Sequence, residues 1–297
     1  NLDTADFTTK HQLITDNPPF SDELEIKCTT SDTSIASNEL IRVRYRFEAN
    51  TLQRLCYGTP DAKSSTLSFY VKTNLEGETF GVALTTQDGT SQVIGTTYTI
   101  ENANTWQRVI FNVPGNVNGT INNDTGNGMM LVWGLTVGSQ FRGTDNSDWV
   151  NNSDAANLTG HTANIASSTD NEWHLTGVQW ELGDTATEFE QETFSQNLAK
   201  CQRYFYRPQV TNNFMGFLMA PDGNANDFVG SVNFPVEMRA SPTATVTCLE
   251  NGSDDALGGI SSGPDVNAVS VHFVRMTNDG NSARRGLSVR GQMDAEL

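Results

Sequence analysis

The sequence has no long hydrophobic run and no export signal at its first residues. A membrane-spanning helix needs about 20 consecutive apolar residues, and no segment approaches that length, so we expect no membrane insertion. The opening residues Asn-Leu-Asp-Thr-Ala-Asp have neither the basic start nor the apolar centre of a signal peptide. They also lack a methionine, which leaves an upstream segment or processing open.

Basic residues are scarce and unevenly placed. The chain has 18 Lys and Arg against 35 Asp and Glu, a formal net charge of −17. Residues 1–195 hold 10 basic against 25 acidic residues, a net of −15, whereas residues 196–297 hold 8 against 10, a net of −2. A nucleic-acid partner needs a cationic surface that displaces counterions, so none is expected. We interpret the acidity as a solvated surface that favours solubility.

Cysteine and histidine are also scarce, and neither shows a metal-ligand spacing. The cysteines are Cys28, Cys56, Cys201 and Cys248, without a CxxC pair. A chain of 297 residues does not need disulfide staples, so we predict free, mostly buried thiols, with a Cys28–Cys56 bridge as the alternative. The histidines are His11, His161, His174 and His272. Their spacing predicts no metal site, and no cofactor is expected.

What the sequence does have is a repeated alternation of apolar and polar residues, which is typical of half-buried β-strands. The pattern covers residues 40–47, 67–73, 80–84, 107–113, 129–137 and 173–182. In the first of these the apolar residues share one face, while Arg42, Arg44 and Arg46 share the other. Six or more antiparallel strands with one apolar face each predict a two-layer sandwich.

The alternation stops between residues 138 and 171, where the sequence is polar. A structureless loop of this length is uncommon in a compact domain and is usually functional or mobile. Trp149 lies in it, surrounded by Asp145, Asn146, Asp148 and Asn151. An aromatic platform beside Asp and Asn side chains is typical of a carbohydrate site, so we predict glycan binding there. The alternative is an exposed Asn-rich loop whose tryptophan packs at the core edge. Such oxygen-rich loops also hold structural Ca²⁺, although the EF-hand spacing is absent.

A short amphipathic helix follows the last of these strands. Leu198, Cys201 and Phe205 fall at i, i+3 and i+7 and form an apolar stripe. Thr193 or Ser195 is expected to cap the N-terminus of the helix. The stripe has to be buried against the C-terminal part of the chain or against a neighbouring subunit, and we predict that it contributes to an oligomer interface.

We expect an all-β protein in three parts. Residues 1–190 form a jelly-roll β-sandwich, a helix over 192–206 lies in a linker at 191–208, and residues 209–297 form a second, smaller β-sandwich-like domain. The last part is predicted from apolar segments between turn signals, at 214–220, 229–234, 243–248, 269–276 and 287–290. A domain of about 90 residues buries a modest core, so we expect it to assemble the protein.

The junction between these parts has a distinctive sequence. It reads Gly-Val-Gln-Trp-Glu-Leu-Gly-Asp-Thr-Ala-Thr-Glu-Phe-Glu at 177–190 and Leu-Ala-Lys-Cys-Gln-Arg-Tyr-Phe at 198–205. It resembles the junction of many phage virion proteins, mostly tail-fibre and appendage proteins, in which a carbohydrate-module-like jelly roll precedes a small C-terminal β domain. Further segments share the resemblance, at 52–59, 62–72, 98–108, 116–128, 234–243 and 294–297. Where the family often has Gln-Leu-Glu, this chain has Gln-Trp-Glu, and Trp180 either fills the core or adds a contact.

The resemblance implies a function that composition alone does not. It implies a virion protein that assembles in the host cytoplasm, forms a homotrimer, contacts other virion proteins and binds a host-surface polysaccharide without catalysis. The alternative is a capsid decoration or head-fibre protein with a structural role. The resemblance is specific for a virion protein and weak for the ligand, because such sandwiches diverge in their loops.

Two patterns fit catalysis only superficially. Residues 259–263 read Gly-Ile-Ser-Ser-Gly, as in a nucleophile elbow around Ser261, but that motif needs a strand before it and a helix after it. Glu188, Glu190 and Glu192 offer the carboxylates that a glycosidase needs, yet alternating acids on a spacer are more typical of a solvated edge. We therefore expect no enzymatic activity, and a glycan-degrading enzyme is the third hypothesis.

Overall fold

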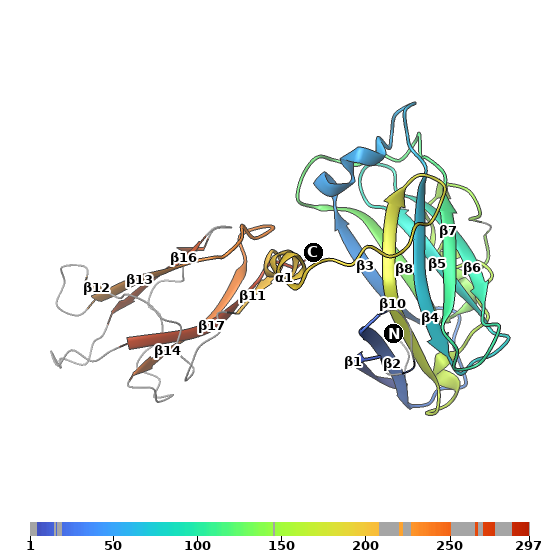
Figure 1. The fold of residues 1–297 in the computed structure, drawn as a ribbon, viewed down its shortest axis with the longest axis horizontal. Coiled ribbons are helices and arrows are strands. Elements are labelled where there is room, and N and C mark those ends of the chain that lie inside the picture. The colour runs from blue at the N-terminus through green and yellow to red at the C-terminus, as the bar shows by residue number, and fades with distance from the viewer. Residues whose placement is uncertain are drawn as a thin grey trace. The chain divides into compact units, whose positions relative to one another are not determined.

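The computed structural model describes residues 5–14, 16, 20–144, 146–207, 220–221, 227–250, 265–266, 270–276 and 287–296. The chain forms two compact units, Asn1–Glu190 and Gln191–Leu297, which run from blue to yellow and from yellow to red in Figure 1. Each unit has its own sheets. None of the helices among the described residues is long and apolar enough to cross a membrane.

The first unit is a sandwich of two five-stranded antiparallel sheets (Figure 1). Sheet A has the order β1-β2-β10-β4-β7, and sheet B has the order β3-β8-β5-β6-β9. The strands of sheet A are β1 (Asp6–Leu13), β2 (Asp22–Thr30), β10 (Glu172–Leu182), β4 (Ser65–Thr73) and β7 (Gln107–Val113). Those of sheet B are β3 (Leu40–Glu48), β8 (Asn127–Val137), β5 (Thr79–Thr86), β6 (Gln92–Thr99) and β9 (Val150–Asn151). The predicted all-β sandwich is confirmed.

The main core lies between the two sheets and consists of the residues that the alternation placed on one face. Leu67, Phe69 and Val71 of β4 are fully buried. The Phe69 ring meets the Trp133 ring of sheet B edge-on, with 5.7 Å between centroids. Each large apolar side chain removed from water contributes roughly 1.5–3 kcal/mol, so this layer supplies most of the stabilisation of the sandwich.

The described part of segment 138–171 is largely irregular, as predicted, but it packs against the sandwich. It contains β9 and three short 3-10 turns, η2 (Ser139–Phe141), η3 (Asp154–Ala156) and η4 (Ile165–Ser167). A second apolar cluster joins it to sheet B, formed by Ala83, Val93, Val132, Val137, Ala156 and Leu158. The segment therefore covers the outer face of sheet B, and β5 and the second half of β8 are buried on both faces.

Glycines in sheet B allow this close approach. A Cβ atom on Gly134 would lie 2.9 Å from Cδ1 of Leu158, and one on Gly81 would lie 3.3 Å from Cδ2 of the same side chain. A Cβ atom on Gly95 would lie 2.4 Å from Nδ2 of Asn146. Glycine inside a strand often marks a place where other atoms approach the backbone closely. Larger residues at these positions would push segment 138–171 away from the sheet.

His161 is the polar anchor of the same segment. Its side chain is buried, Nδ1 accepts a hydrogen bond from the backbone N–H of Gly81 at 3.0 Å, and Nε2 lies 2.8 Å from the carbonyl oxygen of Ala163. Because Nδ1 accepts, Nε2 carries the proton and the imidazole is neutral. Burial lowers the pKa of His161 to about 4, so the ring stays neutral over the whole physiological range.

The Gln and Glu of the junction motif, Gln179 and Glu181, bind the spacer where it folds back on β10. Gln179 Oε1 accepts a hydrogen bond from the backbone N–H of Glu190 at 2.8 Å. Glu181 Oε1 accepts one from the backbone N–H of Thr187 at 2.9 Å, and Oε2 accepts one from the Thr187 hydroxyl at 2.8 Å. These two side chains of β10 bind the backbone of residues 187–190 and hold the spacer against the strand.

The linker helix begins as the sequence predicts. Helix α1 (Phe194–Gln202) has Thr193 as its N-cap. Gln196 Oε1 accepts a hydrogen bond from the Thr193 backbone N–H at 3.0 Å, and the Thr193 hydroxyl accepts one from the Gln196 N–H at 3.4 Å. This capping box satisfies two backbone donors that the first helical turn leaves without partners.

The helix ends earlier than predicted. It stops at Gln202, so the prediction that Phe205 continues its apolar stripe is wrong. Phe205 instead begins β11 (Phe205–Tyr206) and pairs with Asp294. The Tyr204 carbonyl accepts a hydrogen bond from the Ala295 N–H at 2.8 Å. This C-terminal partner takes the chain into a sheet in place of a further helical turn.

The second unit contains a three-stranded sheet, β11-β17-β14, and a four-stranded sheet, β12-β13-β16-β15, among its described residues. Their strands are β17 (Leu287–Asp294), β14 (Thr243–Glu250), β12 (Ala220–Pro221), β13 (Asp227–Asn233), β16 (Ser270–Met276) and β15 (Asp265–Val266). Four of the five predicted strands correspond to β13, β14, β16 and β17. The fifth, at 214–220, lies outside the described residues except for Ala220.

Arg239, in the C-terminal motif at 234–243, binds backbone carbonyl groups of residues 295–296. Its Nε donates to the carbonyl oxygen of Ala295 at 2.8 Å, and its Nη2 donates to that of Glu296 at 2.8 Å. Met238 and Met293 are buried beside it. One guanidinium thus fixes the end of the chain against the motif, using donors in the fork geometry particular to arginine.

Candidate functional site

The outer face of β3 lines a surface groove with a volume of ≈ 670 Å³. Its walls are Ala5, Asn38, Leu40, Ile41, Arg42, Arg44, Phe141, Asp154 and Asn157. β3 is an edge strand of sheet B, and the turns η2 and η3 of segment 138–171 supply the side opposite it. The segment in which the sequence predicted a binding surface therefore contributes one wall of the groove.

Two arginines bring positive charge into this groove. Arg42 is half-buried and Arg44 is exposed, and both face outward because Ile41 and Val43 pack against the main core. Burial lowers the pKa of the Arg42 guanidinium and Arg44 adds to that effect, whereas Asp154 opposes it. The salt bridges that the described residues form include neither Arg42 nor Arg44.

This composition suits an anionic ligand that carries hydroxyl groups. Guanidinium groups offer donors that match carboxylate, sulfate or phosphate oxygens. Asn38, Asn157 and Asp154 can hydrogen-bond hydroxyls, and Phe141 adds an apolar wall. An anion between Arg42 and Arg44 would relieve the repulsion of two like charges, one of which is partly removed from water.

Trp149 lies at the edge of the core. Its indole Nε1 donates to the carbonyl oxygen of Pro114 at 2.8 Å, and its ring meets Tyr57 edge-on with 5.8 Å between centroids. The side chain packs against the main core and is only partly exposed. These contacts describe a structural position for the tryptophan, and its role in glycan binding stays a prediction.

The described residues that were predicted beside Trp149 bind backbone groups or pair with a strand. Asn146 is buried, and its Nδ2 donates to the carbonyl oxygen of Ala156 at 2.7 Å. Asp148 Oδ1 accepts from the backbone N–H of Trp149 at 2.7 Å, and Asn151 pairs with strand β6 as part of β9. Asp145 lies outside the described residues. The buried Asn146 holds the segment together from within.

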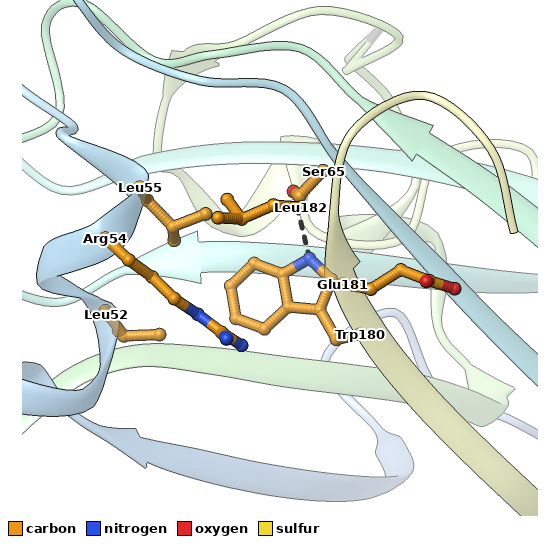
Figure 2. Close-up of a pocket in the computed structure, with 7 residues that line it drawn as sticks. All are labelled: Leu52, Arg54, Leu55, Ser65, Trp180, Glu181 and Leu182. Atoms are coloured by element: carbon orange, nitrogen blue, oxygen red, sulfur yellow. Dashed lines mark hydrogen bonds between the residues drawn. The ribbon is translucent and has the colours of Figure 1, made fainter. Parts of the chain in front are cut away.

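Trp180, the departure from the family motif, fills space beside the 3-10 turn η1 (Ala49–Leu55). Figure 2 shows its ring beside Leu52, Leu55 and Leu182, with Arg54 alongside. Its Nε1 donates to Ser65 Oγ at 3.0 Å. The remaining cavity measures ≈ 20 Å³, which has room for about one water molecule. This geometry favours core filling over an added ligand contact.

The catalytic patterns in the sequence gain no support from their positions. Glu188 and Glu190 are exposed on the spacer. The Gly-x-Ser-x-Gly pattern around Ser261 lies outside the described residues. Cys28, Cys56 and Cys201 are free thiols; the first is buried, the second intermediate and the third exposed. The alternative of a Cys28–Cys56 bridge is therefore wrong.

Comparisons with known proteins identify no family for this chain. No protein-family model matches the chain, and no curated protein matches it. A solved structure described as "CBM4 structure and function" is 10% identical, covers 59% of this chain and 78% of that chain, and has a TM-score of 0.29. A putative sugar-binding protein from Bacteroides thetaiotaomicron is 8% identical, with 60% and 82% covered and a TM-score of 0.30. Both likenesses concern the fold alone.

Proposed function

We propose that this chain is a non-catalytic phage virion protein, a tail fibre or appendage, that binds an acidic host-surface polysaccharide in the groove of β3. The observation that carries the proposal is the pair Arg42 and Arg44 in that groove. Residues 1–195 have a net charge of −15, yet three of their ten basic residues stand on the outer face of one strand. Such a local reversal of charge favours recognition of anions over neutral sugars.

The virion role is supported by the sequence motifs and by the structural reasons found for them. The Gln and Glu of the junction bind the backbone of the spacer, and the arginine of the C-terminal motif binds the end of the chain. These residues belong to the motifs on which the resemblance to phage appendage proteins rests. The proposal accordingly places the protein in the virion, assembled in the host cytoplasm with other virion proteins.

The test is binding of the intact protein to an array of acidic and neutral glycans. Acidic polysaccharide should bind, with affinity that falls as salt is raised, and Arg42→Ala and Arg44→Ala should each weaken binding about tenfold or more. Arg54→Ala is the matched control, because Arg54 is an exposed arginine of the same sandwich outside the groove. Binding lost only in Trp149→Ala would move the site to the predicted position. Binding restricted to neutral glycans would contradict the proposal.

A structural role in the virion is the second candidate, and α1 favours it. Phe194 is 80% exposed and Leu198 is 41% exposed, and Cys201 is also exposed. With Phe205, which is 39% exposed in β11, they give the second unit apolar surface for assembly, and we propose a homotrimer. Light scattering should give three chains for the native protein and fewer for Leu198→Lys. Many copies at capsid positions in a virion image would identify a capsid decoration protein instead of a tail appendage.

A further inference from the structure

A charged cluster is buried on the outer face of sheet A, away from the groove of β3. Glu23 and Glu25 alternate on β2 and so share a face. His174 stands directly opposite Glu25 on β10, the neighbouring strand in sheet A (Figure 1). Ligand atoms of the three side chains all lie within 4.8 Å of one another. The cluster joins strands far apart in sequence, which is why the histidine spacing gave no sign of it.

All three side chains are removed from water. Glu23 is 4% exposed, Glu25 7% and His174 3%. The Gln12 amide of β1 covers the two carboxylates, with Nε2 2.6 Å from Glu23 Oε1 and 2.7 Å from Glu25 Oε2. The Trp106 ring lies edge-on to His174, with 6.3 Å between centroids. Two buried carboxylates need compensating positive charge and direct polar partners.

The protein's own groups satisfy the cluster only in part. His174 Nδ1 lies 2.9 Å from Glu23 Oε1. However, Glu23 Oε2 and Glu25 Oε1 are buried and have no hydrogen-bond partner among the described residues, whereas His174 Nε2 lies 3.4 Å from Glu172 Oε1. Lys10 Nζ is 3.4 Å from Glu25 Oε1, and its side chain is 58% exposed. Two buried carboxylate oxygens thus lack a partner at normal hydrogen-bond distance beside a buried imidazole.

The ammonium group of Lys72 lies closer to Asp16 than to Glu23. Lys72 Nζ lies 2.7 Å from Asp16 Oδ2 but 3.7 Å from Glu23 Oε2. It also sits over the Trp106 ring, 4.8 Å from the centroid. The lysines therefore contribute long-range compensation, and neither ammonium lies within normal hydrogen-bond distance of the two orphaned carboxylate oxygens.

We propose that Glu23, Glu25 and His174 bind one divalent transition-metal ion, with zinc as the ion of choice. Two carboxylates and an imidazole are a ligand set that zinc accepts, at about 2.0–2.2 Å from each donor atom. The imidazole disfavours Ca²⁺, which takes oxygen ligands, so this site differs from the structural Ca²⁺ considered for the Trp149 segment. The ion would displace the Gln12 amide from between the carboxylates and tie β2 to β10. The proposal is independent of glycan binding.

The test is equilibrium dialysis of the intact chain against Zn²⁺ and, separately, against Ca²⁺. All samples carry Cys201→Ser, because the exposed Cys201 thiol would itself bind zinc. The native site should retain one zinc per chain and no calcium. A hundredfold excess of zinc over its Kd should raise the melting temperature of the sandwich by roughly 5–10 °C. Glu25→Gln and His174→Gln should each weaken zinc binding about a hundredfold or more.

The control is His11→Gln, since His11 lies on the same sheet in an exposed pair with Asp22 at 3.1 Å. This variant should bind zinc like the native protein. Equal zinc retention by His174→Gln, or no retention by the native site, would overturn the proposal and leave the cluster as a salt-bridge network within the protein. Should the variants fail to fold, zinc anomalous scattering from crystals of the Cys201→Ser protein decides, because an ion between β2 and β10 supports the site and an ion elsewhere overturns it.

Discussion

The two sheets of the sandwich differ most in what covers their outer faces. On sheet B, segment 138–171 lays an apolar cluster around Leu158 over small residues and glycines. On sheet A, the buried outward-facing residues include the ionisable groups Glu23, Glu25 and His174. The outer face of an antiparallel sheet commonly faces water, so both coverings are additions to the basic sandwich. One is achieved with apolar contacts and the other with ionisable groups.

Burial by itself therefore does not determine how much the outer face of a sheet contributes to the stability of the fold. Apolar burial stabilises the fold in proportion to area and is insensitive to ions. A buried charged cluster adds little net stability unless its partners are complete. The covering of sheet B should therefore contribute more stability than the covering of sheet A, which should respond to ligands.

Leu158→Ala should produce the largest loss. The side chain is 1% exposed and packs against Gly81 and Gly134, so its truncation leaves a cavity that the flat strands cannot fill. We expect a loss of about 3–4 kcal/mol in the free energy of unfolding of the sandwich, measured by urea denaturation with tryptophan fluorescence. Val117→Ala is the control, because Val117 is 54% exposed and should change stability by less than about 0.5 kcal/mol. Equal effects would refute the apolar covering.

His161 should make the same covering sensitive to acid. Its pKa is about 4 in the folded protein, against 6.5 for an ordinary histidine. The unfolded chain therefore takes up a proton first as the pH falls, and this contribution to stability is complete above pH 6.5 and decreases between 6.5 and 4. The loss should reach about 2–3 kcal/mol near its lower limit.

Urea titrations of native protein and His161→Gln at several pH values measure this contribution. The difference between their stabilities should shrink as the pH falls, because the variant has no imidazole to protonate. A difference that stays constant from neutral pH to the acid limit would mean that the His161 ring is already accessible to protons in the folded state.

Six of the ten strands of the sandwich are predicted from the sequence, and β1, β2, β6 and β9 are missed. Leu67, Phe69 and Val71 alternate with polar residues, so β4 was recognisable. In β6, Val93 and Ile94 are adjacent and both are buried, because segment 138–171 covers the outer face. That strand has no period of two to detect. The packing of segment 138–171 on sheet B was also not predicted, because its few apolar residues are spread among Asn, Asp and Ser.

The candidate sites were harder to predict because they depend on register across strands. Arg42 and Arg44 were visible on one face, and their concentration in an acidic region was a usable signal, but the groove wall of Asp154 and Asn157 comes from more than 100 residues away in the chain. His174 meets Glu25 through strand pairing, which no linear spacing encodes. Trp149 was predicted to bind glycan because polar residues flank it in the sequence. In the structure its indole N–H donates a hydrogen bond to the carbonyl oxygen of Pro114.

The smallest effect on stability is expected in the spacer, where residues 187–190 fold back on β10 of sheet A. Gln179 accepts from the Glu190 N–H and donates from Nε2 to the Thr187 hydroxyl at 2.9 Å. Gln179→Leu removes these bonds, together with those of Nε2 to Glu181 Oε1 and to the Glu188 carbonyl oxygen, at a half-buried position, which should cost about 1 kcal/mol of local opening free energy. A protease that cleaves after glutamate should then cut at Glu188 or Glu190 about fivefold faster, because cleavage follows the population of the open form.

Gln140→Leu is the matched change on the other sheet. Gln140 Nε2 donates to Asp154 Oδ2 at 2.9 Å within the covering of sheet B, far in sequence from the spacer. Cleavage at the spacer should be unchanged in this variant. An equal acceleration in both variants would mean that the whole sandwich opens before the protease acts. An acceleration confined to Gln179→Leu would show that the spacer detaches alone. It would also show that Gln179 holds the spacer backbone against β10.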